Sequence, residues 1–180
     1  MHRAAPCRNV PVTFALACTM RSLLSKILGR SNPEPLLDYE KLIQLDAEDL
    51  AEQGIANAYS RLREQLTQYV EQPAEVRELV DNDAPSYRVQ CRGAEHVVYS
   101  PDVPGSDERS WGRATCILFS IVNEQLLNAP VQFYALYAGN DLCGIFLTPE
   151  VARAAQQGMA KPTERPYLPT MEHPYYGQSY

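Results

Sequence analysis

The chain has 180 residues, of which 45% are hydrophobic, and it carries a formal net charge of −6 with a pI near 5.1. A chain of this size and composition can bury a substantial core in one domain without disulfide or metal staples. The acidic balance disfavours direct DNA or RNA binding, because phosphate backbones bind basic faces. No uninterrupted apolar run approaches the roughly 20 residues that a membrane helix requires, so the sequence predicts no membrane span.

The charges are distributed unevenly along the chain. Residues 1–33 contain five basic residues and no acidic one. Residues 38–83 contain twelve acidic residues against four basic ones, which gives that stretch a net charge of −8. A surface of this kind attracts basic protein partners and accelerates their encounter.

Residues 1–36 are expected to form an N-terminal arm and linker outside the fold. The apolar stretch 10–17 has the character of a secretory signal ending near Ala17, which would place the protein in the periplasm or outside the cell. That stretch is short and contains a proline, and translation from Met20 rather than Met1 would remove it. The five cysteines are odd in number and irregularly spaced, unlike a secreted disulfide framework, so a cytoplasmic protein is expected.

A long amphipathic helix is predicted to begin at Asp46, which can cap its N-terminus, and to end before Pro73. Apolar residues from Ile55 to Tyr69 follow one stripe with alternating spacings of four and three residues. That spacing is also a coiled-coil seam, although it persists for only about two heptads, short of the three to four that define one. We interpret the stripe as packing within the chain, with a homodimer through this helix as the alternative.

The next segments alternate between helical and strand patterns. Residues 74–80 are predicted to form a short second helix with Val76, Leu79 and Val80 facing inward. Beyond a turn, the stretch Tyr87–Cys91 alternates apolar and polar residues, and residues 96–99 follow a glycine turn. This pattern predicts a β-hairpin.

Residues 111–128 are predicted to form a central helix that is buried on most sides, with Trp111 as a core anchor. Its β-branched residues would also suit a strand, but the segment is longer than strands usually are. A second hairpin is predicted from residues 131–138 and 142–147, joined at Gly139-Asn140-Asp141.

The last predicted helix begins at Thr148-Pro149-Glu150, which supplies an N-cap, and ends at Gly158. The sequence therefore predicts an α+β fold: a long N-terminal amphipathic helix, an antiparallel sheet built from two hairpins, a buried central helix, a short C-terminal helix and an extended tail. The single domain is expected to cover residues 37–158. Residues 159–180, rich in proline and tyrosine, are expected to form an extended tail packed on or near it.

Standard catalytic signatures for phosphate, dinucleotide, serine-hydrolase and zinc-protease chemistry are absent from the sequence. The three histidines are scattered and no C-x-x-C pair occurs, so neither a metal nor a cofactor is expected. One enzymatic alternative is a thiol-dependent hydrolase or transferase in which Cys91 is the nucleophile, His96 the base and Glu95 its orienting partner. Tyr87, Val89 and Cys91 occupy alternate positions of the predicted strand and therefore share its inward face, which favours an inert core thiol instead.

A non-enzymatic protein-binding function accounts best for the remaining features. The acidic residues Asp46, Glu48, Asp49 and Glu52 are the expected contact surface, and Tyr175 and Tyr176 in the tail supply the rigid aromatic area typical of interfaces. In size, acidity and α+β make-up, residues 37–180 resemble the immunity proteins that bacteria keep against secreted toxins, including type VI effectors. This resemblance lies in general form, with no diagnostic motif, and it implies a cationic toxin, such as a nuclease, as the partner.

Overall fold

The computed structural model describes residues 35–180, so nearly all of the predicted N-terminal arm lies outside the described residues. The described chain contains helices and strands in an α+β arrangement. Its α-helices are α2 (Ala47–Asp49), α3 (Ile55–Leu66), α4 (Ser110–Gln125) and α5 (Pro149–Gly158), and the π-helical segment η2 (Leu50–Gly54) joins α2 to α3. Its strands are β1 (Ile43–Gln44), β2 (Val76–Asp81), β3 (Ser86–Cys91), β4 (Ala94–Tyr99), β5 (Gln132–Leu136) and β6 (Cys143–Leu147).

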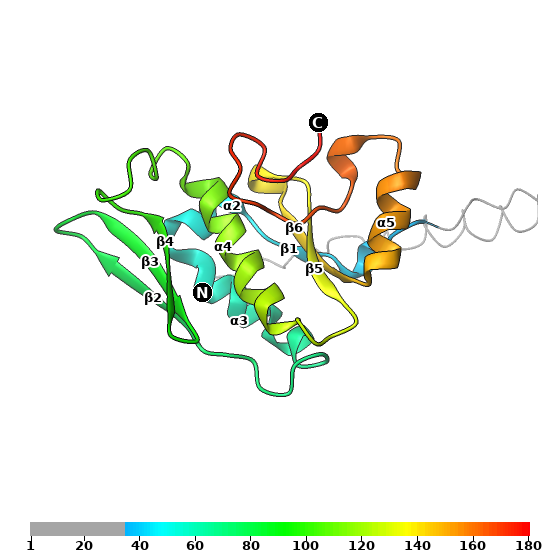
Figure 1. Ribbon diagram of the computed structural model, residues 1–180, viewed down its shortest axis with the longest axis horizontal. Coiled ribbons are helices and arrows are strands. Elements are labelled where there is room, and N and C mark those ends of the chain that lie inside the picture. Colours follow the sequence, from blue (N-terminus) through cyan, green and yellow to red (C-terminus); the bar gives the residue numbers. More distant parts are fainter. Residues whose placement is uncertain (1–34) are drawn as a thin grey trace, which may run out of the picture. The chain divides into compact units, whose positions relative to one another are not determined.

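Within residues 35–180, the two predicted hairpins form, but in two separate antiparallel sheets of three strands each, ordered β2-β3-β4 and β1-β6-β5. The prediction that both hairpins share one sheet is therefore wrong. Each hairpin gains its third strand from elsewhere, because β2 pairs with β3 and the short β1 pairs with β6. Helix α4 lies between the two sheets (Figure 1), so each sheet buries one face against it.

The predicted helix at residues 74–80 is also wrong, because this segment is strand β2. The spacing of Val76, Leu79 and Val80 suits one face of a helix, but β2 runs antiparallel to β3 over its whole length. Long-range pairing with a neighbouring strand outweighs so short a helical pattern. Leu79 and Val80, expected inside, are 41% and 39% exposed.

The long helix is present from Ala47 to Leu66, with the predicted N-cap: Asp46 Oδ1 accepts the amide hydrogens of Glu48 at 2.8 Å and Asp49 at 3.2 Å. It ends before Pro73 and is bent in η2, where the backbone leaves helical geometry at Glu52 and enters the left-handed region at Gln53. Side chains from the β2-β3-β4 sheet then cap α3. The Tyr87 hydroxyl accepts from the Ile55 amide, and the Glu78 carboxylate accepts from the Ala56 amide at 3.0 Å.

The predicted stripe on α3 is used inside the protein. Ile55, Tyr59, Leu62 and Leu66 are all buried in the main core, so the protein's own core covers the face that the homodimer alternative would use. Helix α4 is buried on most of its surface, as predicted, and contributes nine buried residues. Trp111, however, is 43% exposed, so its predicted role as a core anchor is wrong.

A second, smaller core lies on the other face of the β1-β6-β5 sheet, where α5 packs against Tyr134 and Leu136 of β5. Thr148 caps α5 as predicted by accepting from the Val151 amide. The following tail returns along β5, where Tyr167 and Ala135 exchange two backbone hydrogen bonds of 2.8 and 2.9 Å. None of the helices in the described part of the chain is both long and apolar enough to cross a membrane.

Candidate functional site

The bend in η2 creates a small acidic hollow on the surface. It has a volume of about 260 Å³ and is lined by Asp46, Asp49, Leu50, Glu52, Gly54, Asn57 and Arg61. Three of the four acidic residues predicted to contact a partner thus come together in one place. We call this feature the acidic hollow.

The hollow is held in shape by the backbone that surrounds it. One carboxylate oxygen of Asp46 is used as the helix cap, which fixes that side chain at the start of α2. At Gly54, a Cβ atom would lie 2.4 Å from the carbonyl oxygen of Asp49, so only glycine fits where the two halves of the helix meet. These contacts fix the backbone from which Asp49 and Glu52 project.

The fourth predicted acid, Glu48, does not line the hollow. It is half-buried, and its carboxylate accepts from the Asn140 side chain at 3.2 Å, in the turn between β5 and β6. Sequence reasoning missed Asn57 and Arg61, which lie one helical turn apart on α3. Their spacing from Glu52 would have been informative only once the bend at Gln53 was known.

The two predicted tail tyrosines have different environments. Tyr175 is 55% exposed, and its ring lies 4.5 Å from that of Tyr180. Tyr176 is half-buried, and its ring covers Gly112 of α4 so closely that a Cβ there would lie 2.3 Å from it. Tyr176 therefore fixes the tail to α4, while Tyr175 is presented to solvent.

The three residues of the alternative thiol site do not all lie on one face of the sheet. Cys91 pairs with Ala94 across the β3–β4 hairpin, His96 pairs with Val89, and Glu95 pairs with Gln90. Adjacent strand residues point to opposite faces, so Glu95 cannot orient His96. Glu95 instead lies 3.6 Å from the Arg88 guanidinium.

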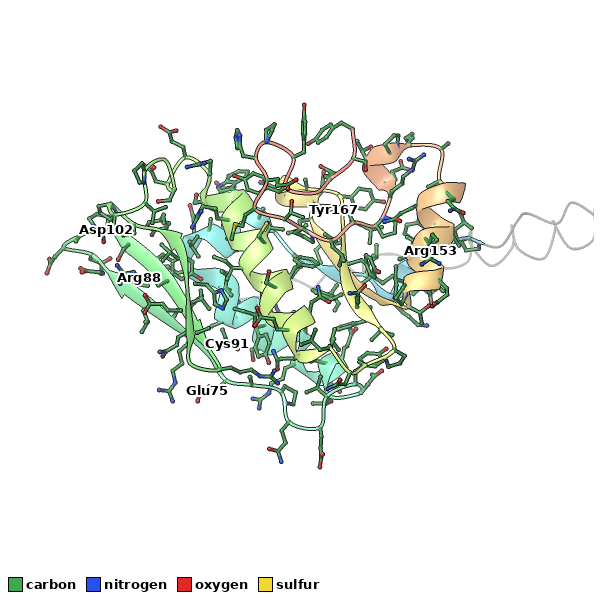
Figure 2. All side chains as sticks on the ribbon, viewed as in Figure 1. Glu75, Arg88, Cys91, Asp102, Arg153 and Tyr167 are labelled. Carbon is green, nitrogen blue, oxygen red and sulfur yellow. The ribbon has the colours of Figure 1, made fainter. Side chains whose placement is uncertain are left out.

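Cys91 lies beside a hollow of about 380 Å³ that Glu75, Arg77 and Arg92 also line. Figure 2 shows Cys91 and Glu75 towards one end of the sheet, and Arg88 and Asp102 towards the other. The thiol is only 4% exposed, and burial raises its pKa above the ordinary cysteine value. A raised pKa keeps the thiol protonated at neutral pH, whereas a nucleophile needs the thiolate.

Iodoacetamide is expected to leave Cys91 unmodified in the folded protein at pH 7.5 and to modify it fully in 6 M guanidinium chloride. The reason is that alkylation requires an exposed thiolate, and the folded chain supplies neither the exposure nor the low pKa. Mass spectrometry of the peptide containing Cys91 measures this residue separately from the other cysteines. Rapid modification in the native state would restore the enzymatic alternative.

The described residues offer no clear metal site, and known proteins give no further guide to the function. Within the described residues, no group of three or more histidine, cysteine, aspartate or glutamate side chains is arranged to hold a metal ion. Comparison of the chain with protein-family models, with curated proteins and with solved structures found no match.

Proposed function

We propose that this protein is a non-enzymatic binding module that docks a basic protein partner through the acidic hollow. The observation that carries the proposal is the meeting of Asp46, Asp49 and Glu52 around a recess of about 260 Å³ at the helical bend. Three carboxylates and one guanidinium, that of Arg61, line the recess, so its balance is negative and suits a lysine or arginine side chain, with Asn57 as a further hydrogen-bonding group.

The overall charge supports the same conclusion. Residues 35–180 carry eleven basic and 21 acidic residues, a more negative balance than that of the whole chain. Such a field speeds the approach of a cationic protein and repels acidic competitors. A basic toxin, neutralised by an immunity protein of the class that residues 37–180 resemble, is the specific form of this proposal.

The test compares two variants of equal charge. Asp49→Lys/Glu52→Lys alters the acidic hollow, and Glu71→Lys/Asp83→Lys alters two exposed acids of the same acidic segment outside it. A basic protein recovered from the producing cells by the unaltered chain is then titrated against each variant by calorimetry. The hollow variant is expected to bind it at least about 30-fold more weakly, because removing one side of a buried, hydrogen-bonded interfacial ion pair typically costs about 2 kcal/mol or more.

The control variant is expected to lose only a few fold, through the general field, and that loss should disappear at 0.5 M salt where the Debye length is short. Equal losses for both variants would show that net charge alone matters and that the acidic hollow is not the contact. Both variants keep Asp46, so the helix cap stays intact.

A further inference from the structure

The β2-β3-β4 sheet has two edges that are treated differently by the rest of the protein. At the β4 edge, the Arg113 side chain of α4 donates to the carbonyl oxygens of Val98 at 2.8 Å and Val97 at 2.6 Å. At the other edge, β2 pairs with β3 on one side, and no element of residues 35–180 pairs with its outer side. An open edge of six residues is a template for another strand.

The side chains on this open edge are unusually apolar for exposed positions. Leu79 and Val80 are adjacent in sequence and are 41% and 39% exposed. A hollow of about 340 Å³ lies beside them, lined also by Glu78, Asp81, Ser86 and Arg88. Exposed edge strands normally avoid such residues, because they promote pairing with other chains.

We propose that β2 pairs with β2 of a second copy of this chain, antiparallel, with Leu79 opposite Leu79 of the second copy. Two three-stranded sheets then join into one six-stranded sheet. The interface does not involve the acidic hollow, and the proposal stands independently of the function proposed above.

The charges of β2 select this register. With Leu79 at the centre, Arg77 faces Asp81 of the second copy, and the same pair recurs on the other side of the two-fold axis. A shift of one position in one direction puts Glu78 opposite Asp81, and in the other direction puts Arg77 opposite Val80. A further shift in that second direction puts Glu78 opposite Glu78 of the second copy. Among these registers, only the proposed one places Arg77 opposite Asp81.

The existing contacts of these two residues leave room for the pair. Asp81 Oδ1 accepts the amide hydrogens of Asp83 at 2.9 Å and Ala84 at 3.1 Å, which leaves its other carboxylate oxygen available. Arg77 contacts Glu75 through Nε and Nη2 at 3.0 Å each, and its remaining guanidinium nitrogen can reach a second carboxylate. Arg77 would thus bridge Glu75 and the second copy's β2.

Sedimentation equilibrium of the full chain tests the proposal. The average molecular mass of the unaltered protein is expected to rise with concentration from 20.2 kDa towards twice that value. Arg77→Asp and Asp81→Arg should each weaken self-association at least tenfold, because each places like charges opposite one another. An equimolar mixture of the two variants should recover the dimer, since position 77 of one variant then faces an opposite charge at position 81 of the other.

Two further variants control for effects on folding. Asp81→Asn retains an oxygen acceptor for the β2–β3 turn while removing the charge, and should also weaken the dimer. Leu127→Asp alters an exposed position in the turn between α4 and β5 and should leave the dimer unchanged. A protein that stays monomeric at all concentrations, a mixture no more associated than its components, or a β2 edge covered only by a strand of a different protein would overturn the proposal.

Discussion

Replacing Gly144 with alanine is expected to lower the free energy of unfolding by about 3 kcal/mol, because the added methyl group would overpack the core. Gly144 lies in β6, and a Cβ atom at this position would lie 2.1 Å from Cζ of Phe133. The Phe133 ring has little room to move, because it is fully buried, is stacked on Phe119 at 4.6 Å and lies 4.7 Å from Phe146.

Urea denaturation followed by circular dichroism measures this effect, and the melting temperature should fall by roughly 10 °C for a domain of this size. Gly93→Ala is a matched control, because a Cβ there has open space and only the positive φ of the hairpin turn opposes it. It should cost about 1 kcal/mol. Adding Phe133→Leu to Gly144→Ala should recover part of the loss, since the smaller side chain leaves room for the methyl group; strict additivity would contradict the steric explanation.

The second large effect is expected at Gly54. Its φ of −103° is accessible to any residue, so alanine is opposed by space alone: the added Cβ would lie 2.4 Å from the backbone carbonyl oxygen of Asp49. We expect Gly54→Ala to lower the free energy of unfolding by about 2 to 3 kcal/mol. Because Asp49 must move to admit the methyl group, the shape of the acidic hollow changes as well.

The same variant therefore tests the link between fold and function. Calorimetry with the basic partner should show a lower affinity for Gly54→Ala even at a temperature where the variant is fully folded. A variant that folds and binds like the unaltered protein would show that the bend is not required for the acidic hollow. Ser60→Ala, an exposed position further along α3, serves as the control.

Local patterns predicted most of the helices and both hairpins, because their signals lie within a few residues of each other. The caps at Asp46 and Thr148 depend on a side chain reaching an amide two or three positions away. The hairpin turn at Arg92-Gly93, where both residues have positive φ, likewise follows from the chemistry of two residues.

The features that sequence reasoning missed depend on distant parts of the chain. Strand β2 has a helical spacing and becomes a strand only because β3 is available to pair with it. The helical bend has a local signal in Gly54, but its stability depends on capping of α3 by Glu78 and Tyr87, which follow more than twenty residues later. The third strand of the second sheet depends on β1, two residues long, pairing with β6.

The candidate site was predicted in part for the same reason. Asp46, Asp49 and Glu52 are close in sequence and on one helical stretch, so their grouping around the hollow follows from local structure. Glu48 is drawn away by Asn140, a contact across more than ninety residues that no local pattern reveals. Cys91 and His96 share one face of the sheet, but Glu95 points to the opposite face, and burial raises the pKa of the Cys91 thiol.

The position of Trp111 has an optical consequence. It is the chain's one tryptophan, and in the folded protein its indole ring is already in contact with water. Its emission maximum is therefore red-shifted before any denaturant is added, and a spectral shift is a poor measure of global unfolding here. The same emission is well placed to report events at the start of α4 and the nearby tail, where Tyr176 covers Gly112.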